Sequence, residues 1–238
     1  MRGCLATLVL AVVFLGIAGW FGGLPVAGLL VETGLGAGGL QAADLDVTVE
    51  TEPRWELLGG RADHVRIVAT NADLRGSSVE RVDLDLTDVS IADRRAGRVD
   101  GELEGIVVHE DGPADGLRIE RIRLDGSDPI VASAEIDNAD AEALVARGVR
   151  ESTGTEPASV SLEAPDRLSI GLGATTLTGR LTVAADGSLV LSVPGIAGAV
   201  IGDLVLVDAA SLPIELRSVS VGDGIVVLEG VLAPGLVG

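Results

Sequence analysis

Residues 82–91 read VDLDLTDVSI, and this stretch decides the fold. From Val82 to Leu86, apolar and acidic residues alternate, which is typical of a strand with one buried face. Val89 and Ile91 continue the alternation on the opposite parity, so a regular strand would turn them toward the other face. A β-bulge between the two sets keeps every apolar side chain on one face and bends the strand. The stretch therefore predicts a curved, bulged strand.

The same change of parity recurs at three other places. It separates the apolar pairs Leu117/Ile119 and Ile122/Leu124, Val99/Leu103 and Ile106/Val108, and Ile214/Leu216 and Val219/Val221. We therefore expect bulges near Thr87–Asp88, Glu120–Arg121 and Arg217–Ser218. Gly105 favours a break between strands at the fourth site, and the alternative for all four sites is a pair of short strands split by a turn. We favour an α+β fold, mainly antiparallel β, built on a strongly curved and bulged sheet.

One main helix is expected at about 138–151, with Asn138 as its N-cap. Its apolar residues follow helical spacing and predict a buried stripe on a sheet: Ala141, Leu144, Val145, Gly148 and Val149. A second, short helix is expected at 53–58. Asp186-Gly187 is expected to turn a β-hairpin, because glycine there supplies a positive φ.

The beginning of the chain differs from the rest in having almost no charged residues. The run 4–30 has no charged residue and is long enough to span a bilayer. We expect a signal anchor, transmembrane segment or signal peptide at 1–30, a Gly-rich tether at 31–43, and a β-rich extracytoplasmic domain at 44–238. A retained anchor is favoured, which places the protein at the cell membrane with its domain outside. The alternative is cleavage to give a secreted or periplasmic protein.

The rest of the chain carries the whole net charge of −19, which comes from 36 acidic and 17 basic residues in the full sequence. Every basic residue is arginine, and Trp55 is the only aromatic residue beyond the leader. Nucleic acid is excluded as a partner, because phosphate contact needs a basic face and base stacking needs aromatic rings. A single cysteine excludes a disulfide scaffold. The acidity is best interpreted as a solvated outer face.

Side chains with catalytic or metal-binding chemistry form no recognisable motif. Asp63-His64 is an Asp-His pair, but no G-x-S-x-G element supplies a nucleophile, and the parity of His64 turns it toward solvent. Acid pairs recur on wet strand faces, where Ca²⁺ or glycoside chemistry is the alternative: Asp83/Asp85, Glu102/Glu104 and Asp111/Asp115. Two histidines and one leader cysteine are too few for zinc. The G-x-G-x-x-G run at 34–39 lacks the strand and helix of a nucleotide site. We therefore expect no catalytic residue, no metal and no cofactor.

The arginines gather in two groups, Arg94/Arg95/Arg98 and Arg118/Arg121/Arg123. A guanidinium group binds carboxylate or phosphate in a bidentate manner. Ion pairing with the many nearby acids is the simpler interpretation. Contact with a lipid phosphate is the alternative.

Three stretches carry a family resemblance: 47–67 (VTVETEPRWELLGGRADHVRI), 82–89 (VDLDLTDV) and 211–225 (SLPIELRSVSVGDGI). Together they resemble the LmeA-like phospholipid-binding family of bacterial cell-envelope proteins. Arg54 and Trp55 depart from the apolar residues that the family has after its proline. The resemblance implies phospholipid binding outside the cytoplasm, a role in envelope lipid or lipoglycan biogenesis, and a build similar to tubular lipid-binding folds. It transfers no catalytic residues.

The leading hypothesis is a membrane-tethered or exported phospholipid-binding module that is not an enzyme. A curved sheet over the 138–151 helix would leave an aliphatic groove, where burial of acyl chains is worth about 0.8 kcal/mol per CH₂. The candidate groove residues are Trp55, Leu58, Leu144, Val145 and Val149, with Arg118, Arg121 and Arg123 at the rim. Two alternatives stay open. One is a structural or adapter β-domain that binds a protein partner along a sheet edge, and the other is an envelope hydrolase that uses His64 or the acid pairs.

Overall fold

The computed structural model describes residues 40–52, 61–74, 77–90, 95–109, 113–127, 129–193, 203–209 and 214–232. The predicted anchor at 1–30 and the predicted short helix at 53–58, with Trp55 and Leu58, lie outside these residues. Within the described ranges, no helix is both long enough and apolar enough to cross a bilayer. The first strand begins at Leu40, inside the range predicted as the tether.

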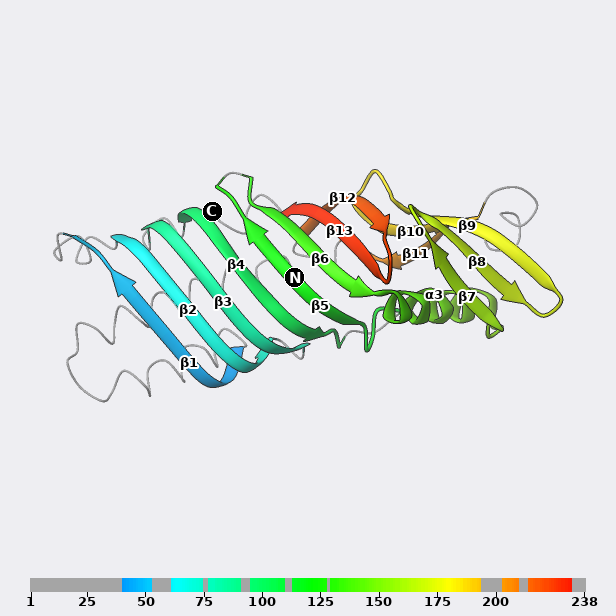
Figure 1. The fold of residues 1–238 in the computed structure, drawn as a ribbon, viewed down its shortest axis with the longest axis horizontal. Coiled ribbons are helices and arrows are strands. Elements are labelled where there is room, and N and C mark those ends of the chain that lie inside the picture. The colour runs from blue at the N-terminus through cyan, green and yellow to red at the C-terminus, as the bar shows by residue number, and fades with distance from the viewer. Residues whose placement is uncertain are drawn as a thin grey trace.

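The described residues form two antiparallel sheets and one helix (Figure 1). The first sheet has eight strands in the order β1-β2-β3-β4-β5-β6-β13-β12. Their bounds are β1 Leu40–Glu50, β2 Arg61–Leu74, β3 Ser77–Ser90, β4 Arg95–Val107, β5 Arg118–Asp125, β6 Val131–Asp137, β12 Ile214–Val221 and β13 Ile225–Leu232.

The second sheet has five strands in the order β11-β10-β9-β8-β7. Their bounds are β7 Ser159–Glu163, β8 Arg167–Leu172, β9 Thr175–Val183, β10 Leu189–Ser192 and β11 Asp203–Val207. The mainly antiparallel β class is therefore confirmed. The expectation of one sheet is wrong, because β12 and β13 return to the first sheet while the strands between α3 and β12 pair with one another.

The helix α3 spans Asn138–Thr153. Its N-cap is Asp137, not the predicted Asn138: Asp137 has an extended backbone, and its Oδ1 accepts the Ala139 N–H at 2.8 Å. Asp and Asn can both cap a helix. β6 ends at Asp137, so the extended backbone that an N-cap needs is found at Asp137, and the helix already begins at Asn138. Gly154 ends the helix with a φ of 70°.

The buried stripe of α3 is the predicted one: Ala141, Leu144, Val145, Gly148 and Val149. The helix contacts β6 and β13 of the first sheet and β7 and β11 of the second, so it lies where the two sheets meet (Figure 1). A Cβ on Gly148 would lie 2.7 Å from Leu206 Cδ2, so glycine permits this close approach to β11. The prediction of a single curved sheet over this helix is therefore only partly right.

The four sites of parity change lie inside continuous strands: β3, β4, β5 and β12. The alternative of paired short strands is wrong, and so is the break expected at Gly105. In β12 the pairing register with β13 shifts between Leu216 and Ser218, which confirms the bulge predicted there.

In β3, the change of face occurs at Asp88, which has a left-handed φ of 52°. The register between β2 and β3 is the same on both sides of Asp88, so one left-handed residue replaces the extra residue of a bulge. Thr87 and Asp88 then both point away from the core, and Leu86 and Val89 both point into it. Similarly, β5 keeps its register with β4 across Glu120, which stands opposite Gly105 with its φ of 60°. The bulges predicted near Thr87–Asp88 and Glu120–Arg121 are therefore wrong.

Two hydrophobic clusters lie in the described structure. The first cluster belongs to the first sheet, and its buried members are Val49, Ala62, Val65, Ile67, Ala69, Ala72, Val79, Val82, Leu84, Leu86, Val89, Val99, Leu103, Ile106, Leu124, Ile130 and Ala132. The second cluster joins α3, the second sheet and the nearby end of the first sheet. Its buried members are Leu117, Ala134, Ile136, Ala141, Leu144, Val145, Val149, Leu162, Leu168, Ile170, Leu181, Leu189, Leu191, Val193, Leu206, Val207, Leu216, Val221, Val226 and Leu228.

The predicted hairpin is present: β9 pairs with β10, and Gly187 in the turn has a φ of 87°. Asp186 Oδ1 accepts the Ser188 N–H at 3.0 Å. This hydrogen bond from the Ser188 backbone favours the charged carboxylate and lowers the pKa of Asp186 below its ordinary value.

We expect Asp186→Asn to cause a small loss of thermal stability at neutral pH and a smaller loss in acid. Because the folded-state pKa is lowered, the carboxylate contributes stability above its unfolded pKa of about 3.9, and this contribution is lost as the pH falls through the folded value. The measurement is the Tm of both proteins at pH 7 and near pH 3. An equal difference in Tm at the two pH values would contradict this assignment.

Candidate functional site

The apolar face of β2, β3 and β4 is built from a sequence repeat, which the alternation of apolar and polar residues along each single strand does not show. Inward positions recur 17 residues apart, as from Ala62 to Val79 to Ala96. The three sets are Ala62, Val65, Ile67, Ala69 and Ala72; Val79, Val82, Leu84, Leu86 and Val89; and Ala96, Val99, Gly101, Leu103 and Ile106. All are buried except Ala96 and Gly101, which are half-buried. The repeat makes three successive strands present the same apolar profile.

The antiparallel register aligns these positions in rows across the sheet. Ile67 stands opposite Leu84, and Leu84 stands opposite Gly101. A Cβ on Gly101 would lie 2.6 Å from Leu84 Cδ2, so the Leu84 side chain covers the space above the glycine. The rows form one uninterrupted aliphatic surface.

This surface is separate from the helix. The buried side chains of α3 all belong to the second cluster, whereas the first cluster draws on β1 to β6 and the segment before β6. An apolar sheet face normally packs against another layer of structure. α3 does not supply that layer over the first cluster, whose buried members are nevertheless at most 7% exposed.

The predicted groove residues divide between two locations. Leu144, Val145 and Val149 come together on α3 but lie in the second cluster, where each is at most 2% exposed. They pack with side chains of the second sheet such as Leu168 and Ile170. Trp55 and Leu58 lie outside the described residues. The assignment of a groove to these five residues stays a prediction.

The predicted rim arginines lie on β5, on the opposite face of the first sheet from the first cluster. All three are ion-paired. Arg118 contacts Glu80 at 3.4 Å and Glu120 at 3.1 Å, and Arg123 contacts Glu135 at 3.2 Å. Arg121 meets three carboxylates, from Glu102, Glu104 and Glu135. The simpler sequence interpretation, pairing with nearby acids, is therefore confirmed. A headgroup role for them stays a prediction.

The same charged face contains a shallow depression of about 380 Å³, lined by Arg81, Asp83, Glu102 and Glu104. Its walls are ionic, so it does not suit an acyl chain. Arg66 and Arg81 both pair with Asp83, at 3.1 and 3.4 Å. The hydrogen bond and charge of Asp83 raise the pKa of Arg66.

Arg98 lies on the same face and joins two strands. It pairs with Asp100 on β4 and, at 2.8 Å, with Asp125 on β5. The hydrogen bond from Arg98 lowers the pKa of Asp100, and the hydrogen bond to Asp100 raises the pKa of Arg98. These shifts describe ion pairing between solvated side chains.

His64 lies on the charged face, as its parity predicts. Its Nε2 is 2.5 Å from Asp85 Oδ1, and its Nδ1 is 3.9 Å from Glu50. Asp63 does not orient it, because Asp63 Oδ2 instead accepts the Glu52 N–H at 2.7 Å. Both of these contacts of the His64 ring are thus with carboxylates, and neither pairs it with the hydroxyl or thiol of a Ser-His or Cys-His arrangement. Among the described residues, no group of three or more His, Cys, Asp or Glu side chains is placed to hold a metal ion.

Fold and side-chain distribution together define a class: a β-rich protein whose first sheet has an aliphatic face on one side and an ion-paired, charged face on the other. Such a face suits long apolar ligands. The chain belongs to the LmeA-like phospholipid-binding family, whose model matches residues 25–231. The match covers most of the chain and confirms the resemblance. No curated protein and no solved structure matches it.

Proposed function

We propose that the protein is an extracytoplasmic phospholipid-binding module of the bacterial cell envelope, with a role in envelope lipid or lipoglycan biogenesis. The family supports phospholipid binding. One observation supports the location of the lipid site: the aliphatic face of β1 to β6 forms a cluster to which no buried side chain of α3 belongs. We place the acyl chains of the lipid against this face.

The chemistry of the face supports this assignment. Its members are Val, Leu, Ile and Ala, so an acyl chain meets no hydrogen-bonding group along the rows. Each CH₂ removed from water contributes about 0.8 kcal/mol, so a few buried methylenes give measurable affinity. The side chains of the first cluster are buried, so lipid entry must exchange protein contacts for lipid contacts.

A leader that inserts in a membrane would complete the proposal. A domain with a net charge of −19 is repelled by anionic headgroups, so electrostatic attraction cannot hold it at such a surface. The predicted anchor at 1–30 supplies an apolar attachment instead.

The test of the function is the lipid content of the purified full chain. The protein is extracted in a mild detergent and exchanged into a lipid-free detergent, and the bound lipid is identified by mass spectrometry. We expect phospholipid at close to one molecule per chain. The same preparation, stripped of lipid and offered phospholipid, should regain it, and failure of both recovery and rebinding would contradict the function.

A second candidate is an adapter domain that binds a protein partner along a sheet edge. The burial of the first cluster inside the protein favours this candidate. In addition, β1 is an edge strand of the first sheet. The exposed acids Asp44, Asp46 and Glu50 along β1 oppose indiscriminate pairing, as charges on edge strands generally do. Absence of bound lipid in the experiment above would favour this candidate.

A further inference from the structure

The outer face of the second sheet holds two arginines side by side. Arg167 on β8 and Arg180 on β9 are directly opposite each other in the antiparallel register. Both are exposed, while their neighbours Leu168 and Leu181 point into the second cluster. Directly opposite side chains on neighbouring strands have Cβ atoms about 5 Å apart, so both guanidinium groups can reach one small ligand.

These two arginines differ from six arginines of the first sheet. Within the described part of the chain, neither side chain makes an ion pair or a hydrogen bond. The contrast is with six arginines that each pair with Asp or Glu: Arg66, Arg81, Arg98, Arg118, Arg121 and Arg123. Like charges directly opposite each other destabilise a sheet. An anion bound between Arg167 and Arg180 would remove this repulsion.

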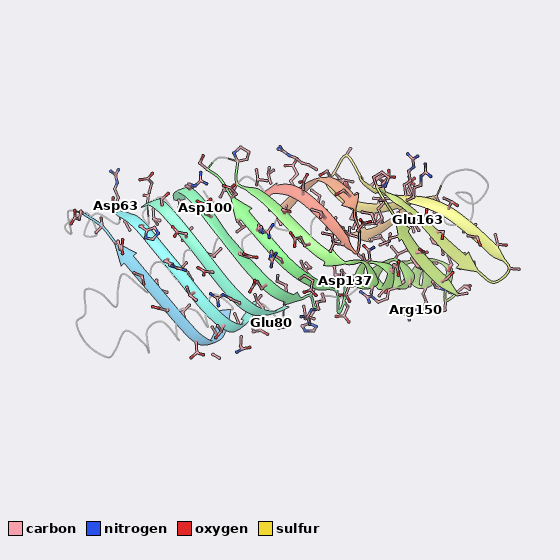
Figure 2. The ribbon with its side chains drawn as sticks, in the orientation of Figure 1. Asp63, Glu80, Asp100, Asp137, Arg150 and Glu163 are labelled. Carbon is pink, nitrogen blue, oxygen red and sulfur yellow. The ribbon has the colours of Figure 1, made fainter. Side chains whose placement is uncertain are left out.

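The row of the sheet that contains the pair continues on both sides. Glu163, at the end of β7 (Figure 2), stands opposite Arg167 in the register, and Ser192 on β10 stands opposite Arg180. Ser192 donates to Asp203 at 2.7 Å, so the carboxylate of Asp203 already has a partner. Glu163 is the remaining competitor for Arg167.

The next rung adds hydroxyl groups. Ser169 stands opposite Ser161 on one side and Thr178 on the other, and all three side chains face away from the second cluster. Hydroxyl donors beside a pair of guanidinium groups provide the hydrogen bonds that a tetrahedral oxyanion accepts.

We propose that Arg167 and Arg180 together bind one phosphate group on the outer face of the second sheet. The phosphate is that of a lipid headgroup or of a soluble phosphate ester. Each planar guanidinium can donate two parallel hydrogen bonds to phosphate oxygens. The inference goes beyond the proposed function, because this site lies on the second sheet and the acyl-chain face is proposed on the first. It rests on the proposed function only for the lipid source of the phosphate.

The test is calorimetric titration of the full chain in nonionic detergent. The probes are glycerol phosphate, which is soluble, and dihexanoyl phosphatidic acid, which carries the same group on a short-chain lipid. We expect Arg167→Gln/Arg180→Gln to weaken binding at least tenfold. The control Arg150→Gln removes an exposed arginine that pairs with Glu156 at 3.3 Å, and it should leave binding unchanged. Glu163→Gln should strengthen binding, because it removes the competing carboxylate.

The stability of the variants separates loss of the site from loss of the fold. The double variant removes a repulsion between exposed groups, so its Tm should equal or exceed that of the wild type. If both probes bind equally, the phosphate of a soluble ester is enough for binding at this site. If only dihexanoyl phosphatidic acid binds, the site requires the phosphate of a lipid headgroup. Unchanged binding in the double variant, or no binding of either probe by the wild type at millimolar concentration, would overturn the proposal. Binding of dioctanoylglycerol, which has no phosphate, is measured in parallel, so that this failure is distinguished from a failure of acyl-chain binding.

Discussion

Replacing Gly101 by valine is expected to lower the free energy of unfolding by roughly 3 kcal/mol, the upper range for over-packing in a filled core. A Cβ at this position would lie 2.5 Å from the Asp83 carbonyl oxygen and 2.9 Å from Leu84 Cα. These are backbone atoms of β3, so the clash cannot be relieved by moving one side chain. The strand must shift, and the aliphatic rows on both sides of it lose their alignment. The measurement is urea unfolding followed by circular dichroism.

The matched control is Gly222→Val, in the turn between β12 and β13. The nearest atom to a Cβ there is the Ile225 carbonyl oxygen at 3.7 Å, which is an ordinary contact. We expect a change below about 0.5 kcal/mol, as for most surface substitutions. Equal losses in the two variants would show that the close packing above Gly101 is not what makes the position sensitive.

Replacing Val65 by threonine is expected to weaken phospholipid binding about tenfold. Val65 is fully buried in the first cluster, and threonine keeps its volume while adding one hydroxyl group. On a strand this hydroxyl has no nearby backbone acceptor of the kind that a helix offers. Burying it without a hydrogen-bond partner therefore costs roughly 1–3 kcal/mol of free energy. The acyl chain would lose favourable contact with the same position. Binding is measured on the folded protein, at a temperature well below the Tm of the variant.

The control for this variant is Val145→Thr on α3. Val145 is equally buried, but it lies in the second cluster. We expect a loss of stability without a change in lipid affinity. A weaker affinity in Val145→Thr and a normal one in Val65→Thr would place the acyl chains at the helix, as the sequence hypothesis did, and would contradict a site on the first sheet.

Features that depend on neighbouring residues were predictable from the sequence. The stripe of α3, the turn at Gly187 and the outward direction of His64 all follow from periodicity or from a single residue type. The bulge at Arg217–Ser218 was predictable for the same reason. The mechanism at Asp88 was not, because a left-handed residue and an extra residue produce the same change of parity in the sequence.

Features that depend on pairing between distant residues were not predicted. The return of β13 to β6 joins residues such as Ile225 and Asp137, and no local pattern encodes that choice. Arg121 acquires its carboxylate partners from β4 and β6 only once the register is set. The 17-residue repeat, in contrast, was present in the sequence. It was hidden because Gly101 occupies a position that leucine and isoleucine fill in the neighbouring strands.

The central claim is that phospholipid acyl chains lie against the apolar face of the first sheet. The most direct test is photocrosslinking of the purified full chain with a phospholipid that carries a diazirine near the end of one acyl chain, followed by mapping of the adducts on tryptic peptides. Cleavage after arginine separates the first-cluster peptides 67–75, 82–94 and 99–118 from the second-sheet peptide 168–180. The account predicts adducts on the first-cluster peptides that unlabelled phospholipid competes away. Adducts confined to the second-cluster peptides 168–180 and 181–217, or no specific adduct at all, would contradict it.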